Sequence, residues 1–160
     1  MVDPGLTTEQ GAAVAEGAAG FGRTITGVYV THAHGDHWCA TAPVRERFPD
    51  LKVWATAETI AEMERTTPGG RPNPFWGAAF PGLIGDTPVI AEAVPEGGLQ
   101  VDGQPLVPRA AGHTDTDHTT FLHMPSLDLV VGGEFPVELR SPGVRRGGRG
   151  GGATRSSRRS

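Results

Sequence analysis

The first half of the chain alternates between hydrophobic patterns of helical type and of strand type. Five segments carry these patterns, and in chain order they predict a helix, a strand, a helix, a strand and a helix: 7–19, 25–31, 38–48, 52–55 and 56–65. Thr7 and Thr56 stand at the starts of two of the expected helices, where a threonine hydroxyl can cap the first turn. Helices alternating with short apolar strands predict a layered α/β domain.

The second half of the chain has a different pattern. Residues 68–88 hold several prolines and glycines and fit no regular element, so this segment is either a functional lid or a disordered loop. Four short runs rich in β-branched residues follow, separated by turn residues: 99–101, 106–111, 119–123 and 127–131. These runs predict a small sheet with hairpin connections.

The composition predicts one folded domain followed by a tail. Apolar residues make up 37% of the 160 residues, while 24 glycines and 14 prolines favour many turns. From about residue 140 onward the chain is mostly Gly, Arg and Ser without apolar periodicity, which predicts disorder. We therefore expect a domain over 1–139 and a disordered Arg/Gly/Ser-rich tail over 140–160.

The charges divide the chain at the same place. All 18 acidic residues and seven of the 14 basic residues lie in 1–139, and the other seven basic residues lie in 140–160. Basic disordered arms can bind nucleic-acid phosphates, but the acidic body argues against this role. Nucleic acid is therefore not the expected partner.

Three features bear on the cellular compartment. Cys39 is the only cysteine, so no disulfide can form within the chain, which is typical of a reducing compartment. No run of 18 apolar residues is present that could span a membrane. Residues 1–6 lack the basic start and apolar centre of a signal peptide. We expect a cytoplasmic protein without membrane contact.

Four potential metal ligands lie within six residues directly after the first expected strand. His32 and His34 have the same parity on an extended chain, so their imidazoles project to the same side, an arrangement that zinc accepts readily. Asp36 and His37 fall where the strand gives way to a helix, and this turn can bring them to a neighbouring position. Four ligands from one loop, with more elsewhere, indicate two hydrolytic metal ions.

Further candidate ligands come from the second half of the chain. His113 ends a strand-like run and is the best candidate for a third histidine beside His32 and His34. Glu134 ends the last strand after two glycines, a position from which a carboxylate can lie between two cations. Asp115 or Asp117 either accepts a hydrogen bond from His113 and so supports it as a ligand, or simply belongs to a polar turn.

Residues from about 3 to about 135 resemble the metallo-β-lactamase fold superfamily of metal-dependent hydrolases. The segment 32–37 matches the His-x-His-x-Asp-His signature of that family, and this motif is highly specific. Residues 112–114 match the segment that supplies the next ligand, and residues 130–134 resemble the strand that ends in a carboxylate shared by both metals. The resemblance implies a four-layered αββα sandwich with the metals at one edge between the sheets.

The resemblance also implies a ligand set and a reaction. The implied ligands form two groups joined by a carboxylate: His32, His34 and His113 for the first ion, Asp36 and His37 for the second, and Glu134 between them. One or two zinc ions are expected, and iron or manganese also suit such donors. The implied activity is attack by a metal-activated hydroxide on a small ester, thioester, lactone or amide, with Asp36 orienting the nucleophile as a catalytic residue.

Three features of the sequence depart from the family pattern. Glu134 stands where the family usually has aspartate, and no histidine follows His123 to supply the family's last ligand. The chain also starts almost at the turn formed by residues 3–5, which family members reach after a pair of strands. We therefore expect an incomplete sandwich, truncated at both ends. Two functions stay open, a metal-dependent hydrolase and an inactive remnant that binds one metal without turnover; a nucleic-acid-binding role is a third hypothesis.

Overall fold

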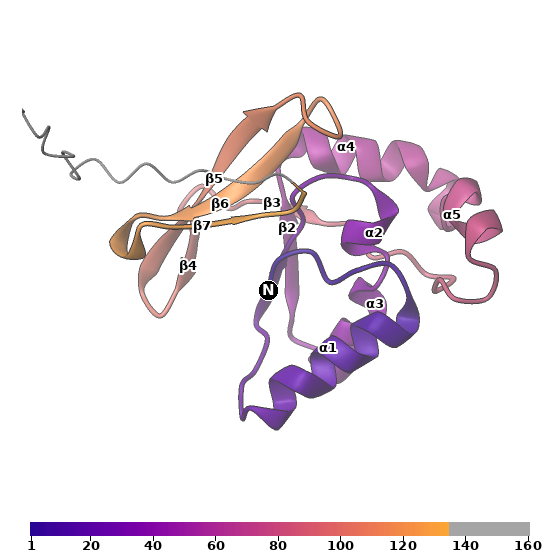
Figure 1. Cartoon of the computed structure of the whole chain (residues 1–160), viewed down its shortest axis with the longest axis horizontal. Coiled ribbons are helices and arrows are strands. Elements are labelled where there is room, and N and C mark those ends of the chain that lie inside the picture. Colours follow the sequence, from indigo (N-terminus) through magenta and orange to yellow (C-terminus); the bar gives the residue numbers. More distant parts are fainter. Residues whose placement is uncertain (135–160) are drawn as a thin grey trace, which may run out of the picture.

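The computed structural model of the chain describes residues 1–134, which form two facing sheets with helices packed over one of them (Figure 1). The tail expected over 140–160, and the end of the domain expected at 139, lie outside the described residues. No helix among residues 1–134 is long and apolar enough to cross a lipid bilayer.

The first sheet is parallel and carries the segment rich in histidines at one edge. Its strands lie in the order β1-β2-β3 and have these bounds: β1 Gly27–Tyr29, β2 Lys52–Ala55 and β3 Glu92–Ala93. Residues 1–3 run parallel to β1, with Val2 paired to Tyr29 and the Asp3 N–H donating to the Tyr29 carbonyl at 3.1 Å. This pairing brings Asp3 to the carboxyl end of β1, where the segment 31–37 begins.

The second sheet is antiparallel with consecutive hairpins, which confirms the prediction for the second half of the chain. Its strands lie in chain order: β4 Leu99–Val101, β5 Gln104–Gly112, β6 Thr119–Met124 and β7 Leu129–Gly132. The β5–β6 connection, residues 113–118, lies beside the carboxyl edge of the first sheet. The backbone N–H of Thr120 and its hydroxyl both donate to the Thr31 carbonyl, at 3.0 and 2.8 Å, and hold the two sheets together there.

Two of the expected helices form with the predicted caps. α1 spans Thr8–Gly20, and the Thr7 hydroxyl accepts from the Gln10 N–H at 3.2 Å while the Gln10 side chain accepts from the Thr7 N–H at 3.0 Å. α4 spans Ala57–Thr66 and begins at Thr56, whose hydroxyl accepts from the backbone N–H of Thr59. Both caps satisfy N–H groups that have no partner within the helix.

The helix expected over 38–48, with Pro43 as its interruption or its start, forms as two helices, α2 over Gly35–Trp38 and α3 over Thr41–Arg47. The break falls at Ala40, whose N–H donates to the Gly5 carbonyl at 2.9 Å instead of continuing α2. Pro43 lies in the first turn of α3, where the missing N–H of proline costs no helical hydrogen bond.

The expectation that residues 68–88 hold no regular element is wrong. A 3₁₀ turn, η1, covers Pro68–Gly70, and a helix, α5, covers Pro74–Ala79. Asn73 caps α5 by accepting from the Phe75 N–H at 2.9 Å, and proline suits the first helical position. Further along, the last expected strand begins at Leu129, because Pro125–Leu127 forms a second 3₁₀ turn, η2.

Two apolar clusters hold the layers together. The larger one lies between the helices and the first sheet and includes Val28, Trp38, Val44 and Met63. The smaller one lies between the two sheets around Tyr29, Leu99 and Leu122. The predicted mixed α/β sandwich of two facing sheets is therefore confirmed, and within residues 1–134 the helices supply one outer layer.

Gly11 and Gly17 of α1 should respond oppositely to alanine. A Cβ on Gly11 would lie 2.3 Å from the Ala40 carbonyl oxygen and 2.6 Å from Pro43, whereas a Cβ on Gly17 would meet nothing within 4 Å. We expect Gly11→Ala to lower the free energy of unfolding by about 1–3 kcal/mol through overpacking. Gly17→Ala should raise it by about 0.4–1 kcal/mol because alanine restricts the unfolded chain. Urea unfolding of both variants measures the difference, and equal shifts would contradict the packing of α1 on α3.

Candidate metal centre

The segment 31–37 follows β1 and is held in place by a hydrogen bond from a buried tryptophan. Trp38 at the end of α2 is buried, and its Nε1–H donates to the Ala33 carbonyl at 3.1 Å. The Thr41 hydroxyl in turn donates to the Trp38 carbonyl at 2.6 Å. These bonds tie the segment to the buried core at Ala33 and just after its last residue, which limits the movement of its backbone.

Asp3 organises the segment from the neighbouring strand. Its Oδ1 accepts from the backbone N–H of Thr31 at 2.9 Å. Its Oδ2 accepts from the Thr31 hydroxyl at 2.7 Å and from His37 Nδ1 at 2.9 Å. The last contact fixes the orientation of the His37 ring and directs Nε2 away from Asp3, as a carboxylate behind a metal-binding imidazole does. Asp3 was not among the residues expected at the site.

His32 is held as the tautomer that can bind a metal. Its side chain is 1% exposed, and Nδ1 lies 3.1 Å from the Thr31 hydroxyl. That hydroxyl already donates its proton to Asp3, so it accepts from His32 and the proton of the ring sits on Nδ1. Nε2 therefore presents a lone pair. Burial, and next the charge of His37, lowers the pKa of His32, which also favours the neutral ring.

His37 lies among three carboxylates. Its Nε2 is 3.2 Å from Glu134 Oε1 and 3.7 Å from Asp36 Oδ2, and Asp3 is bound to Nδ1. Burial alone would lower the pKa of His37, but the hydrogen bond and charge of Asp3, followed by Glu134 and Asp36, outweigh it and raise the pKa. The surroundings of this ring thus favour a positive charge, whether a proton or a metal ion supplies it.

Two buried side-chain polar atoms among residues 1–134 lack a hydrogen-bond partner: His32 Nε2 and Asp36 Oδ1. Buried polar atoms are nearly always paired, because leaving one unpaired costs its full desolvation. Both atoms belong to residue types that bind metal ions, and both lie on the same short segment. The donor set therefore fits a metal ion on the evidence of these unpaired atoms.

The candidate ligand atoms fall into two groups that share His32. His32, His34 and Asp115 form one group, and His32, His37 and Glu134 form the other, with all donor atoms of a group within 4.8 Å of one another. Asp36 lies beside the second group, next to His37. The structure thus brings five of the six expected residues together.

His113 is placed differently from the other five. Its side chain is 77% exposed, and Nδ1 lies 2.6 Å from Asp117 Oδ1. It belongs to neither of the two groups, although it lines the same cleft as His32. The assignment of His113 as a metal ligand stays a prediction.

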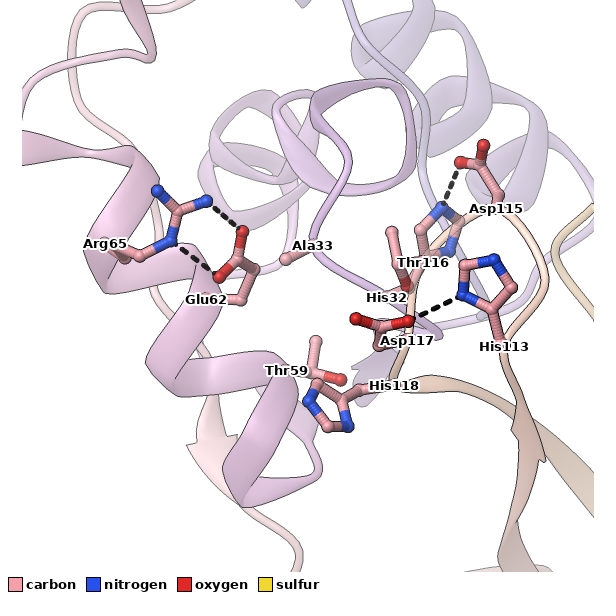
Figure 2. A pocket seen from close by; sticks show the side chains of 10 residues that line it. All are labelled: His32, Ala33, Thr59, Glu62, Arg65, His113, Asp115, Thr116, Asp117 and His118. Atoms are coloured by element: carbon pink, nitrogen blue, oxygen red, sulfur yellow. Dashed lines mark hydrogen bonds and ion pairs between the residues drawn. The ribbon is translucent and has the colours of Figure 1, made fainter.

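A cleft of about 410 Å³ opens beside His32 (Figure 2). The β5–β6 connection forms one wall with His113, Asp115 and Asp117, and helix α4 forms the opposite wall. On α4, Arg65 Nε donates to the Glu62 carboxylate at 2.8 Å. This volume is within the range of pockets for small molecules, and both signs of charge are present on its walls.

Helix α5 approaches the segment 31–37 through Trp76. A Cβ on Gly35 would lie 2.6 Å from Trp76 Cδ1, so the indole packs directly on the backbone between His34 and Asp36. Trp76 also stacks on Phe80 at 6.1 Å between ring centres. The segment 68–88 therefore contributes an aromatic wall beside the candidate ligands, which favours a functional role for it.

Cys39 follows the histidine segment but is not one of the grouped donors. Burial, with a smaller contribution from the charge of Asp36, raises its pKa to about 12. At pH 8 the thiolate fraction should therefore be about 1,000-fold smaller than for an ordinary thiol. We expect iodoacetamide to label the native chain very slowly and the urea-unfolded chain rapidly. Equal rates in the two states, measured by mass spectrometry, would contradict the burial of this thiol.

Comparison with known proteins agrees with this geometry. The family model described as the metallo-beta-lactamase superfamily matches residues 1–135. No curated protein matches the chain significantly.

Several solved structures share the fold at low sequence identity. The TTHA1623 protein, solved in a di-iron-bound form, superposes with a TM-score of 0.59 at 22% identity, covering 85% of this chain and 61% of its own. The B3 metallo-beta-lactamase BLEG-1 gives 0.56 at 18%, covering 80% of this chain and 57% of its own. A beta-lactamase domain protein from Burkholderia ambifaria gives 0.57 at 16%, with coverages of 81% and 41%. The chain thus spans less than two thirds of the length of each of these proteins.

Proposed function

The chain belongs to the metallo-beta-lactamase superfamily, and from that premise we propose that it is a metal-dependent hydrolase of small molecules. The proposed substrates are esters, thioesters, lactones or amides. The observation that carries the proposal is the unpaired lone pair of buried His32 Nε2, which faces further metal-binding side chains at the mouth of a cleft.

Two sets of residues would hold metal ions in this proposal. His32 and His34 would hold the first ion together with one further side chain, for which the family resemblance names His113. Asp36 and His37 would hold the second, with Glu134 between the two. Bound there, the ions would supply a hydroxide nucleophile at neutral pH and polarise the bond to be cleaved.

The protein's own side chains would position these groups and the substrate. Asp3 keeps His37 in one orientation, and the Thr31 hydroxyl keeps the proton of His32 on Nδ1. Asp36 has a buried oxygen without a partner, which can accept a hydrogen bond from the attacking nucleophile and orient it. The cleft beside His32 admits a small molecule and offers Arg65 as a cationic contact.

Zinc is the metal we propose, because zinc binds imidazole and carboxylate donors in catalytic sites. Iron and manganese accept the same donors. We also propose a cytoplasmic location, for which the single cysteine is the supporting feature.

A hydrolysis assay on the full chain tests the proposal. Protein purified without chelator and supplied with zinc should hydrolyse generic aryl esters, thioesters or lactones. Activity should disappear with a chelator and return when zinc is restored. Metal-loaded protein that hydrolyses none of these substrates would contradict the proposed activity.

One observation favours a second candidate, a chain that binds a single metal without turnover. Both donor groups share His32, so one imidazole would have to serve both. Among residues 1–134, the donors available to a second ion are then His37, Asp36 and Glu134. One equivalent of bound metal together with no hydrolysis of any of the substrates would support this candidate over the hydrolase.

A further inference from the structure

We propose that Trp76 and Phe75 on α5 bind an apolar group of the substrate, so that the preferred substrates are esters or thioesters of apolar acids. This inference rests on the proposed function, because it names the substrate class that the hydrolase would prefer. It gives a role in specificity to side chains of the segment 68–88 that do not line the cleft beside His32.

Trp76 lies against the backbone at the centre of the candidate ligand segment. Gly35 has no side chain, and an added Cβ there would lie 2.6 Å from both Cδ1 and Nε1 of the indole. Gly35 is flanked by His34 and Asp36, whose side chains are partly exposed. A substrate that approaches either side chain therefore comes close to the indole, and Figure 1 shows α5 beside α2.

Trp38, and not Trp76, fills the core beneath this segment. Trp38 is 1% exposed, and its indole N–H donates to the Ala33 carbonyl. Trp76 is only half-buried, and Phe75, whose ring meets it edge to face at 5.1 Å between centres, is 67% exposed. Aromatic surface that stays open beside polar side chains is suited to binding an apolar group.

The aromatic surface of α5 is held in a fixed position. Phe80, directly after α5, stacks on Trp76, and Asn73 caps the start of the helix. Beyond the helix, the Leu83 carbonyl accepts from the Thr8 N–H at 2.9 Å, which ties this part of the chain to α1. A surface that is already ordered loses little conformational freedom when a ligand binds to it.

The two helices beside the segment 31–37 differ in charge. On α4, the ion pair between Glu62 and Arg65 lines the cleft. Residues 72–85, which include α5, contain no charged side chain. A substrate with a polar leaving group and an apolar acyl group matches both surfaces, with its acyl group against Trp76. A charged acyl group would lose hydration there without gaining an ionic partner.

Hydrolysis of p-nitrophenyl acetate, butyrate and hexanoate by the zinc-loaded full chain tests the inference. The leaving group is the same in all three esters, so differences beyond their alkaline hydrolysis rates report on the acyl group. For wild type, kcat/KM should rise by about twofold for each added CH₂, about half the effect of full burial. Trp76→Ala should lower kcat/KM for the hexanoate by more than about fivefold, mainly through KM, and for the acetate by less than about twofold.

Two further variants show whether the effect belongs to the aromatic surface. Trp76→Phe should restore most of the preference for the hexanoate, because it keeps an aromatic ring beside Gly35. Phe21→Ala is the matched control, since it removes an 84% exposed ring at the far end of α1 and should change no rate. Zinc content and thermal unfolding of each variant show that metal and fold are retained.

Binding of hexanoate and acetate to the same proteins, measured by calorimetry, separates this inference from the proposed function. Hexanoate should bind to wild type more than about fivefold more tightly than acetate, and Trp76→Ala should lose this difference. Wild type that hydrolyses none of the esters would contradict the proposed function, and the two carboxylates then decide on the apolar site alone.

The inference is overturned if wild type has no preference for the longer chain, or if Trp76→Ala keeps that preference in turnover and in binding. If Trp76→Ala does not fold, Phe75→Ala decides, because that side chain is exposed and contributes little to folding. A preference reduced by more than about twofold then supports the inference, and an unchanged preference overturns it.

Discussion

Replacing His32 with alanine should remove most of the metal affinity of the chain. His32 belongs to both groups of converging donor atoms, its Nε2 has no other partner, and its side chain is almost fully buried. Every ion bound by either group would therefore lose one of its ligands. We expect the zinc dissociation constant to rise by more than about 100-fold, a larger effect than loss of a supporting residue causes.

Isothermal titration of wild type and variant measures this change. His123→Gln on β6 is a suitable control because that histidine belongs to neither donor group, and its zinc affinity should equal that of wild type. His32→Asn preserves more of the buried volume and covers the case in which the alanine variant unfolds. A dissociation constant within threefold of wild type for the His32 variants would show that His32 is not a ligand.

Asp3→Asn should weaken metal binding without removing any ligand. An asparagine can still accept from the Thr31 N–H, but one carboxylate oxygen is replaced by an amide that cannot accept from both the Thr31 hydroxyl and His37 Nδ1. His37 then loses its fixed orientation, and His32 loses the constraint on its tautomer. We expect a 10–100-fold loss of zinc affinity, as is typical for residues behind metal ligands.

The same variant has a second, independent effect in the metal-free chain. Asp3 is the main contributor that raises the pKa of His37, through its hydrogen bond and its charge. Removing that charge should lower the pKa of His37, which proton NMR titration of the ring detects. Asp50→Asn, an exposed surface substitution, is the control and should change neither quantity. An unchanged His37 pKa together with unchanged zinc affinity would show that Asp3 has no such role.

Local signals in the sequence predicted the framework around the site well. The caps at Thr7 and Thr56, the strand at 52–55 and the hairpins after residue 99 depend on neighbouring residues, and the structure confirms them. The signal of the candidate ligand segment 32–37 is equally local, since the spacing of its residues alone predicts imidazoles that project to one side. The residue types that mark each of these features lie close together in the sequence, so a local pattern is sufficient to identify them.

The features that the sequence did not predict depend on contacts between distant segments. The break at Ala40 arises from a hydrogen bond to Gly5, which no local pattern shows. Asp3 reaches His37 because residues 1–3 pair with β1. Asp115 faces His32 because a bulge in β5 rotates the following turn. The proline after Asn73 was a local signal for α5 that the abundance of turn residues obscured.

Metal content is the most direct test of the central claim that segment 31–37 is a metal centre. The full chain should be purified without chelator, supplied with zinc, iron(II) and manganese(II) in separate preparations, freed of unbound metal and measured by inductively coupled plasma mass spectrometry. We predict at least one equivalent of metal per chain in at least one preparation, and less than a tenth of that in His32→Ala. Wild-type protein without stoichiometric metal in any preparation would contradict the claim.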